Sequence, residues 1–139
     1  MNNSAKLLRF SLLAGALYFA AVALVHTFGV KVPGLFIYFN VPSNAYQDQI
    51  ISFLTFGWAA LFYVASISPA TNRNSVLAVL ISSVVAIFGL VRINAFSDFQ
   101  ALSPDISVSP FWVQTTLLAA YVGWLVVLFI KTRLIDEAV

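Results

Sequence analysis

The sequence predicts an all-α membrane protein in which four helices cross the bilayer as a bundle. Apolar residues make up 61% of the 139 residues and charged residues only 9%, against about 25% charged residues in an ordinary soluble domain. The mean hydropathy of +0.95 is too high for a soluble chain of this length, because a small domain leaves much of its surface exposed. Lipid must therefore be the solvent for a large part of the chain.

Four apolar runs have the length of a membrane-spanning helix. We place them at residues 7–30, 49–68, 75–96 and 111–130. Each is close to the ~20 residues that cross a hydrocarbon core of about 30 Å. Transmembrane β-strands are excluded, because such strands have about 9–11 residues of alternating polarity, whereas these runs are apolar on every face. The spans use nearly the whole chain, so residues 1–139 are expected to form a single domain.

Positive side chains favour an orientation with both termini in the cytoplasm. In that orientation Lys31, with Arg92 at the edge of a span, lies on the outer side. The cations on the cytoplasmic side are Lys6, Arg9, Arg73, Lys131 and Arg133. Because Lys and Arg in short loops concentrate in the cytoplasm, this bias predicts N-in and C-in. The first apolar run is longer than a signal-peptide core of about 7–15 residues, although Ala21 and Ala23 keep cleavage as an alternative.

The two predicted outer loops differ in character. The first, residues 31–48, is too apolar to lie free in water, and aromatic side chains favour the membrane interface. We expect Leu35–Phe39 to lie on the bilayer or to fold back over the bundle. Ser43 and Asn44 precede Tyr46 and Gln47 in the arrangement of a helix N-terminus, so the second helix is expected to begin a turn before its apolar run. The second outer loop, residues 94–110, has the Ser, Pro and Asp content of ordinary turns.

Four polar residues lie at one depth near the outer ends of the spans, one from each predicted helix, with Asp48 at the start of the second: His26, Asp48, Arg92 and Gln114. Polar side chains at membrane depth are costly unless paired, and they usually point into the bundle. Three interpretations stay open: interfacial residues that reach the headgroups, a structural Asp48–Arg92 pair that closes the outer end, or a binding site for a small or lipid-like ligand. We expect Arg92 and Asp48 to face inward and approach each other, because pairing offsets much of the cost of burying a charge. His26 and Gln114 would line the same outer pocket.

The sequence carries no recognisable set of reacting groups. His26 is the single histidine and cysteine is absent, which excludes bis-histidine haem ligation and most zinc, copper and di-iron sites within one chain. A glycine-rich phosphate loop, a nucleophile elbow and a zinc-protease helix motif are also missing. We therefore expect no catalytic residue, no metal and no cofactor. The pI near 9.2 does not indicate a nucleic-acid partner, because the cations lie at the ends of apolar runs.

Small residues recur at four-residue spacing, which lets helix backbones approach closely in lipid. The positions are Ser11/Gly15, Ala16/Ala20, Ala78/Ser82/Ala86 and Ala119/Gly123. This spacing fits packing inside the bundle, and it also fits a face for a partner protein or a second copy. Trp58 and Trp124 lie about mid-span, and we expect them to be packing residues rather than walls of a pocket.

A bundle of four helices with an arginine, Arg92, near the end of the third span resembles the small bacterial membrane proteins of DoxX-like type. The resemblance covers the architecture of most of the chain and no specific sequence motif. It implies a four-helix membrane bundle and assigns no role to any residue.

Without a set of reacting groups, the sequence favours a non-enzymatic accessory or structural subunit of a membrane assembly. Its partners would be membrane lipids together with other membrane subunits or a second copy of the chain. The alternative is binding or transport of a small apolar or amphipathic ligand, lipid-like or quinone-like, at the outer polar pocket. An enzyme that uses His26 as acid or base is the least favoured class. Size and charge bias are typical of a multi-pass protein of the bacterial inner membrane.

Overall fold

All four predicted spans form α-helices in the computed structural model, which describes residues 3–136, with side chains described to residue 132. The helices are α1 (Asn3–Thr27), α2 (Ala45–Ile67), α3 (Arg73–Phe96) and α4 (Ser109–Asp136). Each is long and apolar enough to cross a membrane, in α4 over Ser109–Thr132. The described residues form no β-strand. The predicted all-α bundle of four membrane helices is therefore confirmed, and the chain is a multi-pass membrane protein.

The helix ends follow local signals that the apolar runs only partly reveal. α1 ends at Thr27 rather than at the predicted residue 30, because Gly29 takes a left-handed φ of 65° that turns the chain away from the helix. α2 begins at Ala45, about one turn before the apolar run, as the polar residues within 43–47 predicted. The backbone N–H of Asn44 donates to Gln47 Oε1 at 3.0 Å. The early start of α2 is therefore confirmed.

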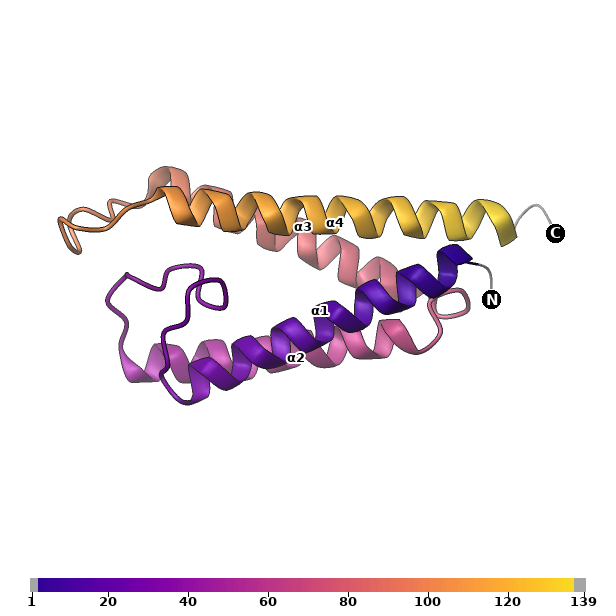
Figure 1. Cartoon of the computed structure of the whole chain (residues 1–139), viewed down its shortest axis with the longest axis horizontal. Helices are drawn as coiled ribbons and strands as arrows, with labels where there is room; N and C mark the ends of the chain where they lie inside the picture. The colour runs from indigo at the N-terminus through magenta and orange to yellow at the C-terminus, as the bar shows by residue number, and fades with distance from the viewer. Residues whose placement is uncertain (1–2, 137–139) are drawn as a thin grey trace.

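The helices pack tightly at one end of the bundle and spread at the other. We call the end near both termini the terminal end, and the opposite end, which holds the loops 28–44 and 97–108, the loop end. Figure 1 shows α1 and α2 side by side, while α4 meets α1 at the terminal end and diverges from it toward the loop end. Buried residues of all four helices form the main core at the terminal end: Leu8, Leu12, Ala16, Phe62, Ala65, Val76, Val79, Leu80, Leu125 and Leu128. Because lipid is as apolar as these side chains, close van der Waals packing holds this core together.

Small residues lie both inside and outside the bundle. Gly15 and Ala16 of α1 are buried, whereas Ala78 of α3 and Gly123 of α4 are exposed. The packing interpretation of the small-residue spacing therefore holds for α1. The exposed positions on α3 and α4 face the surroundings of the bundle.

The first loop, residues 28–44, folds back over the loop end of the bundle. Phe36 is 4% exposed, and its ring stacks on the ring of His26 with centroids 3.6 Å apart. Tyr38 meets Phe111 of α4 edge-on, with ring centroids 4.9 Å apart. Of the two predicted placements for this apolar segment, folding back over the bundle is confirmed.

The second loop, residues 97–108, holds more than the ordinary turns that its composition predicted. Phe99 and Ile106 are buried and form a second core with Phe111 of α4. The first loop packs against this core through Tyr38, whose ring stacks on that of Phe99 with centroids 5.6 Å apart. The two loops therefore form one structure, which we call the loop cover.

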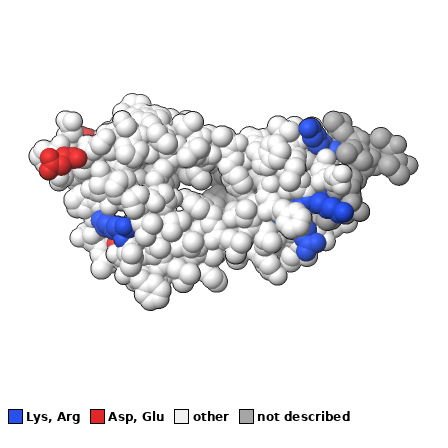
Figure 2. All heavy atoms as spheres, viewed as in Figure 1, with Lys and Arg blue, Asp and Glu red and all other residues white. Residues whose placement is uncertain are grey.

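Charged groups are unevenly distributed between the two ends of the bundle. Figure 2 shows basic side chains gathered at the terminal end, and acidic side chains at the loop end with a basic group near them. The N-in, C-in orientation rests on this asymmetry. The packing of the helices does not test the orientation, which stays a prediction.

Candidate functional site

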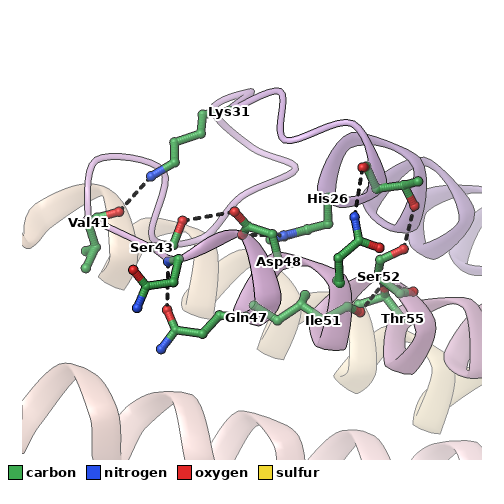
Figure 3. Close-up of polar contacts among 12 residues, drawn as sticks. His26, Lys31, Val41, Ser43, Gln47, Asp48, Ile51, Ser52 and Thr55 are labelled. Atoms are coloured by element: carbon green, nitrogen blue, oxygen red, sulfur yellow. Dashed lines mark hydrogen bonds and ion pairs between the residues drawn. The ribbon is translucent and has the colours of Figure 1, made fainter.

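A buried hydrogen-bonded pair joins the last turn of α1 to the first turn of α2. His26 Nδ1 lies 3.2 Å from Asp48 Oδ1, and Ser43 Oγ donates a hydrogen bond to Asp48 Oδ2 at 3.1 Å. Figure 3 shows Ser43 and His26 on opposite sides of the Asp48 carboxylate. Asp48 also lies at the positive N-terminal end of the α2 dipole, which favours its negative charge. Both carboxylate oxygens of Asp48 therefore have partners.

Further hydrogen bonds tie the same two helix ends together. Ser52 Oγ donates to the carbonyl of Ala23 at 3.0 Å, and Gln49 Nε2 donates to the carbonyl of Thr27 at 3.2 Å. The hydroxyl of Thr27 donates to the carbonyl of Ala23 at 2.8 Å and lies 2.5 Å from Ser52 Oγ. Carbonyls in the last turn of a helix lack intrahelical partners, and Gln49 supplies one for Thr27. This polar seam therefore fixes α1 to α2 at membrane depth.

Arg92 takes no part in this cluster, and the predicted Asp48–Arg92 pair is wrong. The Arg92 side chain is exposed, and Asp48 pairs with His26 instead. The reason lies in the direction of side chains around α3. Leu90 lines the cavity described below, and Asn94 is buried. Since successive helical residues are about 100° apart, Arg92 lies on the opposite face of α3 from both.

An apolar cavity of about 460 Å³ lies between the spread parts of the four helices. Phe62 and Tyr121 stack against each other at its inner end, where Gly15 leaves room for both rings. Gly34 and Ile37 of the first loop line the cavity at the loop end. All four helices contribute to its walls, and Figure 2 shows the surface hollowed between α1 and α4. The cavity is therefore bounded at both ends and open at the side of the bundle.

The side walls of the cavity are aromatic and aliphatic. Trp58 of α2 lines the cavity, and its ring stacks on that of Phe19 of α1 with centroids 5.5 Å apart. Trp58 is thus both a packing residue and a pocket wall, and the expectation that it would not line a pocket is wrong. Trp124 lies elsewhere, with its Nε1 donating to Ser11 Oγ at 3.1 Å.

Of the four predicted site residues, Gln114 is the one that lines the cavity. Its Oε1 atom is buried and has no hydrogen-bond partner among the described residues. The tyrosine hydroxyls of the lining are engaged: Tyr18 donates to the Gly34 carbonyl at 3.0 Å, and Tyr121 donates to the Ser11 carbonyl at 2.7 Å. The described lining residues carry no charge. Gln114 therefore gives the cavity an unused polar group.

The buried amide of Asn94 has a partner at both its nitrogen and its oxygen, and it anchors the loop cover. Asn94 Nδ2 donates to Thr115 Oγ1 at 3.0 Å, and Asn94 Oδ1 accepts a hydrogen bond from the Tyr38 hydroxyl at 2.9 Å. Burial raises the pKa of Tyr38 to about 12, so this phenol keeps its proton at neutral pH. The bond from Tyr38 ties the first loop to α3 and, through Thr115, to α4.

The predicted site residues lie in three places: a histidine–aspartate pair beneath the first loop, Gln114 in the cavity wall, and Arg92 on the outer surface of α3. The sequence reasoning missed the aromatic residues of the cavity, above all Trp58 and Tyr121. Their position at mid-span was a signal, because aromatic side chains at that depth cannot serve as anchors at the membrane interface.

Comparisons of the chain with models of protein families, with curated proteins and with solved structures give no match. Function is therefore inferred from the described residues of this chain.

Proposed function

We propose that the protein binds a small apolar or amphipathic molecule, lipid-like or quinone-like, in the cavity between its four helices. The observation that carries the proposal is the cavity of about 460 Å³, whose wall is apolar apart from a few hydroxyl groups and the Gln114 amide. Small-molecule sites have volumes of about 300–1,000 Å³ and combine apolar walls with a few placed polar groups. The cavity has both properties.

An empty cavity of this size would be unfavourable. Voids in protein cores destabilise by about 24 cal/mol per Å³, so a closed void of about 460 Å³ would cost on the order of 10 kcal/mol, comparable to the whole stability of many domains. Because the cavity is open at the side of the bundle, molecules dissolved in the membrane can fill it. The unused amide of Gln114 supports preference for a particular molecule over bulk acyl chains.

The surroundings of His26 do not favour acid–base catalysis in the cavity. Its Nδ1 is bonded to Asp48, and Phe36 covers its ring. The described lining of the cavity includes neither His26 nor Asp48. These positions support binding or transport rather than a reaction.

Retention of a small molecule tests the proposal. Ala86 and Ala78 are both exposed residues of α3, but Ala86 lines the cavity and Ala78 does not. We expect protein purified in a mild detergent to retain a small molecule that native mass spectrometry detects. Ala86→Phe should fill part of the cavity and strongly reduce the retained amount, while Ala78→Phe should leave it unchanged. Equal retention by the two variants, or none by the wild type, would contradict ligand binding.

The accessory-subunit hypothesis has one observation in its favour. Ala78, Ala119 and Gly123 are exposed on α3 and α4, and small residues on a lipid-facing surface allow another helix to approach closely. A stoichiometric partner chain or a second copy in the same mass spectra, without a small molecule, would favour an accessory or structural role over ligand binding.

We also infer, from the size and the charge bias of the chain, that the protein lies in a bacterial inner membrane with its loop end outside. In that orientation the loop cover separates the cavity from external water.

A further inference from the structure

We propose that the cavity prefers an uncharged molecule with one hydrogen-bonding group at one end, namely an alcohol with an apolar body of about a dozen carbons. This inference rests on the proposed function and specifies the chemistry of the ligand. Three properties of the cavity lead to it: the absence of charge from its described lining, the position of its unused amide, and its volume.

The lining disfavours charged ligands. None of the described residues that line the cavity is acidic or basic. The buried acid–base pair of α1 and α2 is closed on itself, since Asp48 is bonded to His26 and to Ser43. A carboxylate or phosphate at membrane depth without a counter-charge is strongly unfavourable. Fatty acids and phospholipid headgroups are therefore poor occupants, and neutral molecules remain.

The unused amide of Gln114 sets the direction of the ligand. Gln114 lies in the second turn of α4, and therefore near the loop end. A primary amide can both accept and donate, so it can bond a hydroxyl group in either sense. The hydroxyl groups of Tyr18, Thr55 and Tyr121 in the lining are already committed, because each donates to a backbone carbonyl. Ser83 of α3 also lines the cavity, and the Ser83→Ala variant below separates its contribution from that of Gln114. The polar end of the ligand is thus expected at Gln114.

The volume and the inner wall define the apolar body of the ligand. At ~30 Å³ for each water-sized group, about 460 Å³ holds roughly fifteen such groups. Tyr121 follows Gln114 by seven residues on α4, which corresponds to about 10 Å along the helix. The stacked rings of Phe62 and Tyr121 form the inner end. A chain of about twelve carbons therefore fits with its hydroxyl at Gln114 and its tail toward these rings.

Trp58 can report occupancy, because it lines the cavity. In a variant with Trp112→Phe and Trp124→Phe, Trp58 is the single tryptophan. The probes are 1-dodecanol, dodecane and dodecanoate, titrated in detergent micelles at about pH 9, where the carboxylate is ionised. One hydrogen bond corresponds to roughly tenfold in affinity. We therefore expect 1-dodecanol to change Trp58 fluorescence at roughly tenfold lower mole fraction than either other probe.

Gln114→Leu tests the residue itself, because leucine is similar in size and has no hydrogen-bonding group. In this variant 1-dodecanol should bind no better than dodecane. Unchanged dodecane binding would show that the cavity is still folded. Ser83→Ala, which removes a hydroxyl from the α3 part of the lining, should keep the preference for the alcohol.

The outcomes separate this inference from the proposed function. If dodecanoate binds as tightly as 1-dodecanol, or if the alcohol preference survives Gln114→Leu, the inference is wrong while ligand binding stands. If none of the probes alters Trp58 fluorescence, and Ala86→Phe and Ala78→Phe retain equal amounts of small molecule, ligand binding is wrong and the inference falls with it.

Discussion

Gly15→Ala should destabilise the protein, although the same exchange usually stabilises a helix. A Cβ atom built at Gly15 would lie 2.5 Å from Phe62 Cδ1 and 2.5 Å from the hydroxyl oxygen of Tyr121. Both rings are held in place: Phe62 is 1% exposed in the main core, and Tyr121 donates to the Ser11 carbonyl at 2.7 Å. At least one ring must move to admit the methyl group.

The expected magnitude follows from three contributions. Alanine is favoured over glycine in a helix interior by about 1 kcal/mol. Overpacking a filled site costs about 1–3 kcal/mol, and losing the Tyr121 hydrogen bond adds about 1 kcal/mol. The net effect is destabilisation by about 1–3 kcal/mol. Gly123 offers a matched control, because nothing lies within 4 Å of its built Cβ, and Gly123→Ala should stabilise by up to about 1 kcal/mol.

Reversible unfolding in mixed micelles gives both free energies, with circular dichroism measured as the mole fraction of SDS rises. The two variants should move in opposite directions and differ by about 1–4 kcal/mol. If Gly15→Ala proves as stable as Gly123→Ala, the close approach of Phe62 and Tyr121 to α1 is wrong. The inner wall assigned to the cavity would then be wrong as well.

Three further predictions concern orientation, the polar pair and the loop cover. Because the chain contains no cysteine, single cysteines can report the orientation. Those at positions 44 and 103 should react with an impermeant thiol reagent added outside, and those at 3, 72 and 136 should not. Labelling of position 72 from outside would contradict the predicted orientation. In a double-mutant cycle, His26→Ala and Asp48→Ala should be coupled by about 1–3 kcal/mol, while Arg92→Ala should change stability by less than about 0.5 kcal/mol; additive effects of the first two would contradict the pair. Tyr38→Phe should cost about 1–3 kcal/mol, because it leaves the buried Asn94 Oδ1 without a partner. Since burial raises the pKa of Tyr38 to about 12, the stability that this hydrogen bond contributes should be complete below about pH 10 and lost as the pH rises through 12. The ionisation of Tyr38 can be followed as the difference in phenolate absorbance between the wild type and Tyr38→Phe. A midpoint near pH 10 in this titration would refute the burial of Tyr38.

The helices could be predicted because an apolar run of about 20 residues is a strong signal on its own. Their ends could be predicted where a polar residue marks them, as Asn44 marks the start of α2. The end of α1 at Thr27 was hidden, because Phe28 and Val30 continue the apolar run past the turn at Gly29. Local turn chemistry thus overrides hydropathy at that point.

The depth of polar residues could be predicted, but their direction around the helix could not. Residue counts give depth because the rise per residue is constant. Direction is normally read from an apolar stripe, and helices that are apolar on every face have none. His26 and Asp48 meet because α1 and α2 pack closely at that level, whereas Arg92 faces outward because Leu90 and Asn94 face inward.

The cavity depends on the arrangement of all four helices, which the sequence does not reveal. It exists because the main core closes the terminal end while the helices spread toward the loop end. The loop cover then places Gly34 and Ile37 over the space between them. The apolar character of Leu35–Phe39 indicates that this segment avoids water, but it does not indicate that the segment covers a cavity.

The loop cover has a thermodynamic consequence for any molecule that occupies the cavity. Tyr18 and Tyr38 bond the first loop to its surroundings, and Phe36 stacks on α1, so the route to the cavity runs sideways through lipid rather than from water. Occupancy is then set by the mole fraction of the ligand among the lipids, because the bilayer acts as a local reservoir with a high effective concentration. A modest preference of the site over bulk acyl chains is therefore enough to fill it. The dissociation constant of a molecule bound in the cavity would then be meaningful as a ligand-to-lipid ratio, and it would change with the amount of detergent or lipid in the assay.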